Sequence, residues 1–296
     1  MYYIAYSFLY LLSLLPFPIL YLISDLAAFT LEKVVKYRRT IILNNLEIAF
    51  PEKTLAERKQ ICHKFYYLLT DNFIETIKLF TLPRRRIRHH FQVDLSILEE
   101  LKKEGKSFNV LLGHFFNWEF ANLAFSEKFD CENLLLVYMP IKNQAINRVF
   151  QNLRSRFGSK LISAHTYGHD FQPYRRKHFA QLLVSDQNPG GPEYANWVPF
   201  FGKNAPFVNG PEKSARFYNT AIVFCNIFPE RRGYYKAELT LLTKNARELQ
   251  SGELIVEFVK FLEASIRKNP ANYLWSHRRY KHEFKEEIHG KLLLKK

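Results

Sequence analysis

Four short apolar runs, separated by segments of helical periodicity, restrict this 296-residue chain to few folds. The runs cover residues 109–112, 134–139, 182–185 and 221–227. Helical patterns lie beside and between them, at residues 95–103, 117–129, 144–157, 171–180 and 211–219. Strands that alternate with helices form a mostly parallel sheet that the helices cover. We therefore predict an α/β fold, completed by an antiparallel strand at 234–242 and a helix at 253–267.

The N-terminus is predicted to contact a membrane. Residues 1–24 carry no charged side chain, and the stretch from Ile4 to Ile23 is about long enough to cross a ~30 Å hydrocarbon layer. No basic residue precedes it and no small-x-small site closes it, which is not typical of a cleaved signal peptide. Pro16 and Pro18 leave open a kinked span or a helix lying in the interface. We expect a membrane anchor at residues 1–30 and one domain at residues 31–296.

The formal net charge of +15 predicts an anionic partner, either nucleic acid or membrane head groups. Most aromatic residues lie in apolar runs and not among Lys and Arg, so a nucleic acid is not expected. By the positive-inside rule, the basic residues at 33–39 place the rest of the chain in the cytoplasm. Three widely spaced cysteines indicate neither a disulfide framework nor a zinc site. No phosphate-loop or dinucleotide motif occurs, and we expect no metal and no cofactor.

A base and a carboxylate, His114 and Glu119, directly follow the apolar run at 109–112. Five residues of helix rotate by about 140°, so the two side chains can meet only across a break in the helix. If residues 107–112 form a strand and a helix starts at Asn117, Glu119 lies in the first turn and can face the imidazole. Such a pair suits general-base catalysis. The alternative is a histidine that packs in the core.

The same spacing occurs at three other places: His89 and Asp94, His165 and Asp170, and His282 and Glu287. Only His114 follows a strand-like run closed by glycine, which places it at the carboxyl edge of a sheet, where α/β proteins bind ligands. Asp186 ends another apolar run at this edge, either as part of the site or as a cap of backbone amides. Residues 187–209 show no clear element, and a loop of that length is usually functional.

Further segments occur in a specific order along nearly the whole chain. They are Tyr37-Arg38-Arg39, Asn44-Asn45-Leu46, Ala49-Phe50-Pro51, the His114 to Glu119 box, Arg154-Ser155-Arg156-Phe157-Gly158, Ser185-Asp186-Gln187, Val198-Pro199-Phe200-Phe201-Gly202 and Pro270 to Tyr280. With the uncharged N-terminus, this series resembles the bacterial lipid A biosynthesis acyltransferase family, the late lauroyl and myristoyl acyltransferases, within the wider lysophospholipid acyltransferase group. The resemblance implies a glycerolipid-acyltransferase-like α/β fold.

The resemblance also implies a reaction: transfer of a fatty acyl chain from acyl carrier protein to a hydroxyl of a lipid A precursor. His114 would be the general base and Glu119 would orient its ring. Arg154 or Arg156, matching the family's basic residue before Phe-Gly, would bind a phosphate or the developing oxyanion, and the sequence does not say which. Asp186, in the family's Asp-Gln segment, would either support a residue that contacts the substrate or bind the acceptor itself, and Gln187 would bind the substrate.

The resemblance implies a location at the cytoplasmic face of the bacterial inner membrane. Acyl carrier protein and lipid A precursors are acidic, so the basic run at residues 84–88 is expected to face the carrier or the anionic head groups. Residues 188–192 do not align with the lauroyl branch, which leaves an aminolipid or glycolipid as an alternative acceptor. A non-catalytic basic membrane adaptor is the alternative from another class, and the presence of both His114 and Glu119 argues against it.

Overall fold

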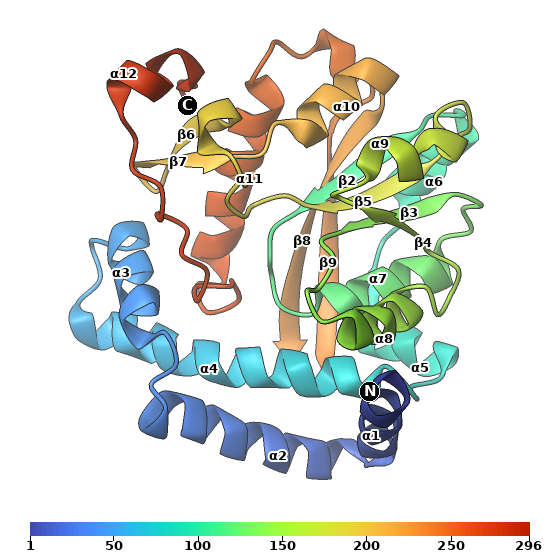
Figure 1. The fold of residues 1–296 in the computed structure, drawn as a ribbon, viewed down its shortest axis with the longest axis vertical. Helices are drawn as coiled ribbons and strands as arrows, with labels where there is room; N and C mark the ends of the chain where they lie inside the picture. Colours follow the sequence, from blue (N-terminus) through green and yellow to red (C-terminus); the bar gives the residue numbers. More distant parts are fainter.

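The computed structural model describes residues 1–296 and contains a seven-stranded sheet in the order β1-β9-β8-β2-β5-β3-β4 (Figure 1). Neighbouring strands are parallel except β8 and β9, which are antiparallel. The strands are β1 (Phe91–Val93), β2 (Phe108–Leu112), β3 (Leu134–Tyr138), β4 (Lys160–Ser163), β5 (Ala180–Val184), β8 (Ala221–Arg231) and β9 (Tyr234–Thr243). The predicted α/β class and the antiparallel strand are confirmed.

Helices cover both faces of the sheet (Figure 1). On one face, Phe224 of β8 packs against Phe258 and Phe261 of α11, with ring centroids 5.7 and 4.9 Å apart. On the other face, Phe120 of α7 packs against Tyr235 of β9 at 6.1 Å. The helices of residues 84–268 are α5 (Arg84–His90), α6 (Ser96–Lys103), α7 (Trp118–Lys128), α8 (Gln144–Arg154), α9 (Tyr167–Asp170), α10 (Gly210–Tyr218) and α11 (Glu253–Lys268).

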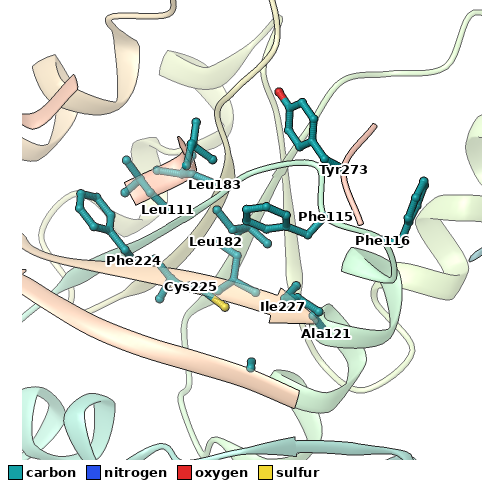
Figure 2. Close-up of a cluster of buried hydrophobic side chains, with 14 of the residues drawn as sticks. Leu111, Phe115, Phe116, Ala121, Leu182, Leu183, Phe224, Cys225, Ile227 and Tyr273 are labelled. Carbon is teal, nitrogen blue, oxygen red and sulfur yellow. The ribbon is translucent and has the colours of Figure 1, made fainter. Parts of the chain in front are cut away.

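The core lies between these layers. All five side chains of β2 are buried, because a central parallel strand has helices on both of its faces. Figure 2 shows Leu111, Leu183 and Phe224 gathered on one side, with Phe115 lying between this group and Tyr273. The loop that follows β2 is therefore held by apolar packing as well as by the strand itself.

The local sequence explains two helix ends. Thr54 and Glu57 form both hydrogen bonds of a capping box at the start of α4 (Leu55–Lys78). α6 ends at Lys103, shortly before Gly105, whose φ of +67° lies in the left-handed region that favours glycine.

Two other expectations are wrong. Residues 171–180 are not a helix: after the short α9, only a 3₁₀ turn at Gln172–Tyr174 occurs before β5 begins. Residues 187–209 are not one open loop, because β6 (Asn196–Phe200) and β7 (Lys203–Phe207) pair antiparallel there. Pro199 and Pro206 conceal these strands in the sequence, and proline is tolerated here because each strand has only one partner.

The N-terminal helices α1 (Tyr2–Leu14) and α2 (Phe17–Phe29) are separated by a bend of 115°, and neither is long and apolar enough to cross a membrane alone. α2 lies alongside α4 (Figure 1), where Ser24 donates to Asp71 Oδ1 at 2.6 Å. The remaining helices are α3 (Arg39–Ala49) and α12 (Glu286–His289). Fourteen of the 20 exposed large apolar side chains belong to residues 1–35, so one side of this pair presents an uncovered apolar surface.

Candidate active site

The sheet brings His114 and Asp186 together. β2 and β5 are parallel neighbours with Leu112 opposite Val184, so the residues two positions beyond each strand end meet at the same edge. Asp186 Oδ1 accepts a hydrogen bond from the backbone N–H of His114 at 3.0 Å and lies 2.5 Å from its Nδ1. The adjacent Gly113 is required by close packing, because a Cβ at this position would lie 2.6 Å from Leu262 of α11.

The contact with Asp186 fixes the tautomer of His114. A carboxylate only accepts hydrogen bonds, so Nδ1 must carry the proton and Nε2 is left free. Burial alone would raise the pKa of Asp186, but the neighbouring His114 and hydrogen bonds from His114 and Tyr273 outweigh it and lower the pKa to about 2. Asp186 is therefore an ionised partner at neutral pH. The side chain of His114 is 18% exposed, compared with 2% for Asp186, so the imidazole is the member that a substrate can reach.

The structure corrects the predicted role of Glu119. Glu119 does lie in the first turn of α7, but it faces Arg154, the last residue of α8, and not the imidazole. Arg154 donates from Nε to both carboxylate oxygens at 3.0 Å and from Nη2 to Oε1 at 2.5 Å. The start of α7 is directed toward α8, while β5 supplies the acid for His114. In the sequence, the pairing of His114 with Asp186 was indicated by their positions after two predicted strands of the same sheet edge, and not by the spacing of five residues.

His114 and the Glu119–Arg154 pair line one pocket of about 810 Å³, while Asp186 lies behind the imidazole and outside the lining. Trp118 and Gln187 also line it. Eighteen of the 33 lining residues are hydrophobic; on the sheet and α7 they include Val110, Leu112, Ala121, Phe125, Leu136 and Leu182, and further lining comes from within residues 187–195 and 208–214. Polar side chains beside a largely apolar lining suit a ligand that has a long hydrocarbon chain and a reactive polar end.

The two candidate arginines are placed differently. Arg154 reaches the pocket, and its Nη1 makes no hydrogen bond, so this donor is available to a ligand. Arg156 lies beyond the end of α8 and its Nη1 donates to the carbonyl oxygens of Leu79 and Leu82, the second at 2.9 Å. Arg156 therefore ties the segment after α4 to α8 and is not part of the pocket.

A buried glutamate supports the loop between His114 and α7. Asn117, the residue before α7, has a φ of +67° and donates from Nδ2 to Glu75 Oε2 at 2.6 Å. Its backbone N–H donates to Asn72 Oδ1 at 2.8 Å. The hydroxyls of Tyr21 and Tyr235 also donate to Glu75, at 2.9 and 2.7 Å. α2, α4, β9 and the His114 loop thus share one hydrogen-bonded centre.

Burial raises the pKa of Glu75 to about 7, although the hydrogen bonds from Tyr235, Tyr21 and Asn117 oppose this. Its pKa in an unfolded chain is close to 4.5, so the folded state holds the proton more tightly. The resulting stabilisation is complete below pH 4.5 and is lost as the pH rises through about 7. We expect this group to remove on the order of 3 kcal/mol from the free energy of unfolding over that interval.

Glu75→Gln tests this expectation because an amide does not titrate. Denaturant unfolding of both proteins between pH 4.5 and 7 should show a flatter pH dependence for the variant, whatever its absolute stability. Parallel curves would mean that Glu75 does not change its protonation on unfolding.

The chain after α11 supports the loop that follows Asp186. Burial lowers the pKa of His277 to about 4, so its ring is neutral and Nε2 can accept from the backbone N–H of Asn188, 3.3 Å away. Arg279 is 2% exposed, donates to Asn188 Oδ1 at 2.5 Å and lies over the ring of Phe207. Sequence analysis had assigned no role to His277, which occurs in the segment Pro270 to Tyr280.

The other histidines with an acid five residues away form no such pair. Asp94 accepts from the backbone N–H of Ser96, and Asp170 accepts from Ser163 and Thr166. His282 makes no ion pair or hydrogen bond with Glu287. No group of three or more His, Cys, Asp or Glu side chains in the structure is arranged to hold a metal ion.

Comparison with known proteins identifies the family of this chain. The sequence profile of one family, described as bacterial lipid A biosynthesis acyltransferase, matches residues 1–282. The chain belongs to this family. It is an acyltransferase of lipid A biosynthesis, as the resemblance had indicated.

Three curated relatives of this acyltransferase show how far the similarity extends. The lipid A biosynthesis palmitoleoyltransferase of Escherichia coli (strain K12) is 24% identical over 271 residues, which cover 90% of this chain and 86% of that protein. The lipid A biosynthesis lauroyltransferase of the same organism is 23% identical over 279 residues, covering 92% and 89%. The lipid A biosynthesis acyltransferase of Haemophilus influenzae is 21% identical over 273 residues, covering 90% and 83%.

Proposed function

We propose that this acyltransferase moves a fatty acyl chain from the thioester of acyl carrier protein to a hydroxyl of a lipid A precursor, with His114 as general base. The observation that carries the proposal is the free Nε2 of His114 at a pocket of about 810 Å³, with Nδ1 held by an ionised carboxylate. The curated relatives are named for acyl transfer in lipid A biosynthesis, which supports the same acceptor class here.

The proposed reaction uses this geometry. Nε2 of His114 takes the proton of the acceptor hydroxyl while the hydroxyl oxygen attacks the thioester carbonyl. Asp186 stabilises the imidazolium that forms, as the acid of a catalytic triad does. When the tetrahedral intermediate collapses, the C–S bond breaks, the new C–O ester bond remains, and the imidazolium returns the proton to the thiolate. No acyl-enzyme is required, because the thioester is already activated.

Arg154 is proposed to stabilise the negative charge that develops on the carbonyl oxygen. Glu119 holds Nε and Nη2 of the guanidinium, which leaves Nη1 as the free donor. A donor that is fixed before the reaction stabilises a transition state more than a mobile one, because it need not reorganise. Glu119 is thus a positioning residue for Arg154. Gln187, which lines the same pocket, is proposed to contact the acceptor.

The N-terminal helices are proposed to hold the enzyme on the cytoplasmic face of the bacterial inner membrane. Their uncovered apolar side favours a bent pair lying in the interface, because α2 also packs along α4 through buried polar contacts. The net charge of +15 would attract both anionic head groups and the acidic carrier. An aminolipid or glycolipid acceptor is the alternative for the same chemistry.

The direct test uses purified protein, a fatty acyl carrier thioester and lipid A precursor, with the acylated product measured by mass. Lipids from cells that lack the protein supply the acceptor: loss of one acyl chain from lipid A is the expected result. Loss from an aminolipid or glycolipid would support the alternative acceptor. A wild-type enzyme that is inert toward every lipid offered would favour the basic adaptor.

The two arginines should respond differently to substitution. Arg154→Gln should lower turnover roughly 10²-fold even at saturating substrate, because it removes one donor to the developing oxyanion. Arg156→Gln should leave turnover near that of the wild type and lower the free energy of unfolding by about 1–3 kcal/mol, because two backbone carbonyls lose a charged donor. Steady-state kinetics and denaturant unfolding on both variants make the comparison. A reversal of the two phenotypes would contradict the placement of Arg154 in the site.

A further inference from the structure

A second pocket, of about 460 Å³, lies outside the active site and shares no residue with it. Its five lining residues come from α5 and from the start of β9: Arg85, Arg86, His89, His90 and Tyr234. Four of them are basic residue types and none is acidic. Such a composition suits an anion, and phosphate is the biological anion that arginine binds best.

The arginines of this pocket have no partner within the protein. Arg85 and Arg86 are exposed, and their side chains form no ion pair and no hydrogen bond. Their neighbours in the basic run are already engaged: Arg88 donates to Glu127 at 2.6 and 2.7 Å, and Arg84 lies over the ring of Phe157. Both guanidinium groups therefore keep their N–H donors free to bind an oxyanion at the pocket.

The other pocket residues are held in place by packing. His90 is buried, its ring stacks on Tyr234 with centroids 4.6 Å apart, and its Nδ1 lies 2.7 Å from the carbonyl oxygen of Gly233. A carbonyl only accepts, so Nδ1 donates there. Burial lowers the pKa of His90, so the ring is neutral and its Nε2 carries no proton; His90 forms part of the pocket wall, and the guanidinium groups supply the donors. Arg231 adds a further cation, 3.9 Å over the ring of Tyr234. His90 and Tyr234 therefore form a fixed wall beside the arginines of α5.

The pocket adjoins the apolar N-terminal helices. Phe17, the first residue of α2, packs against His90 with ring centroids 5.1 Å apart, at the bend between α1 and α2. The helices beyond this bend present the uncovered apolar side of residues 1–35. The pocket therefore adjoins the segment that we propose contacts the membrane.

We propose that Arg85, Arg86, His89, His90 and Tyr234 form a binding site for the phosphate group of an anionic membrane phospholipid. The proposal rests on the membrane association included in the proposed function, and not on the acyl-transfer chemistry. The phospholipid is neither donor nor acceptor: it fixes the orientation of the enzyme on the membrane, so that the active-site pocket faces the surface at a constant height.

The test is vesicle binding by purified full-length protein. Vesicles contain phosphatidylcholine alone or phosphatidylcholine with phosphatidylglycerol, and bound protein is measured by co-sedimentation. The pocket variant is Arg85→Gln/Arg86→Gln. The matched control is Arg175→Gln/Arg176→Gln, which removes the same charge from two exposed, unpaired arginines in the segment before β5. Melting temperatures establish that both variants are folded.

The pocket variant should bind anionic vesicles about tenfold or more weakly than the control, and both should bind phosphatidylcholine equally. Equal losses of vesicle binding in both variants would show that binding depends only on the total charge of the protein. Unchanged vesicle binding in both would show that the pocket does not bind lipid. Each of these results overturns the proposal. Acyl transfer in neutral detergent micelles should be unchanged in the pocket variant.

Two further experiments distinguish the phospholipid from other ligands of this pocket. Inorganic phosphate added to the wild type, at constant ionic strength against chloride, is followed by the NMR signals of ¹³C-labelled His89 and His90. Saturable shifts that vanish in the pocket variant, without a vesicle-binding defect, would identify a soluble phosphate ligand and overturn the lipid. A raised KM for the acyl carrier thioester in micelles, again without a vesicle defect, would identify the carrier. An inert wild type that retains the vesicle result would refute only the acyl-transfer proposal.

Discussion

Replacing His114 with alanine is expected to lower acyl transfer by about 10²–10⁴-fold, because the acceptor hydroxyl loses its general base. The fold should persist. The backbone carbonyl of His114 still accepts from Leu274, and its N–H still donates to Asp186. Turnover with a fatty acyl carrier thioester, measured beside circular dichroism and the melting temperature, tests both statements.

Two histidines with the same spacing to an acid serve as controls for this experiment. His165→Ala and His282→Ala should each retain most of the activity, because neither side chain lines the active-site pocket. A folded His114→Ala enzyme with near wild-type turnover would refute the assignment of the base.

Replacing Asp186 with asparagine is expected to lower turnover roughly 10³-fold, somewhat less than the ~10⁴-fold known for the equivalent change in a serine protease triad. Both hydrogen bonds from His114 end on Oδ1, which an asparagine oxygen can replace. The substitution therefore removes charge with little change of shape. The imidazolium formed during the reaction loses its counter-ion.

The split between kcat and KM distinguishes this effect from simple damage. The pKa of Asp186 is lowered to about 2, so its carboxylate stays ionised throughout the working range. In Asp186→Asn, kcat should fall while KM changes little, because Asp186 does not line the active-site pocket. A loss that appears only as a raised KM, with kcat unchanged, would contradict the role given to Asp186.

Glu119→Gln provides the comparison between the two carboxylates. It should lower turnover through Arg154, and the double variant Glu119→Gln/Arg154→Gln should lose little more than Arg154→Gln alone, because Glu119 contacts the guanidinium and not the imidazole. If the losses from Glu119→Gln and His114→Ala overlapped in this way and those from Asp186→Asn and His114→Ala did not, the original sequence prediction for Glu119 would hold and the role given to Asp186 would fail.

The sequence predicted the fold class and most long elements, because each is specified locally. The capping box of α4, the glycine after α6 and the fully apolar β2 are readable within a few residues. β6 and β7 were missed because their prolines are typical of loops, although a two-stranded sheet leaves room for them. The helix predicted at residues 171–180 was wrong for a similar reason: Pro173 and the start of β5 divide the segment.

His114, Glu119, Arg154 and Gln187 line one pocket, but the predicted pairing of His114 with Glu119 is not found. Asp186 is 72 residues from His114, and only the pairing of β2 with β5 makes them neighbours, which periodicity does not reveal. The choice between Arg154 and Arg156 depended on where α8 ends, and helix ends are the least readable boundaries in a sequence. The basic run at residues 84–88 likewise divides into paired and unpaired arginines only through Glu127 and Phe157, which are distant in the chain.

The hydrogen bond from Tyr21 to Glu75 makes the N-terminal helices part of the catalytic machinery's scaffold. A shortened protein that starts after Phe29 would leave Glu75 without one donor and Asp71 without Ser24. The loosened carboxylate would then hold Asn117 less firmly, and the His114 loop would gain freedom. Truncation is the usual way to make a protein with apolar terminal helices more soluble, but here it would also leave the proposed base less ordered. Substituting polar residues on the exposed side of α1 and α2, with both helices retained, is the better route for engineering.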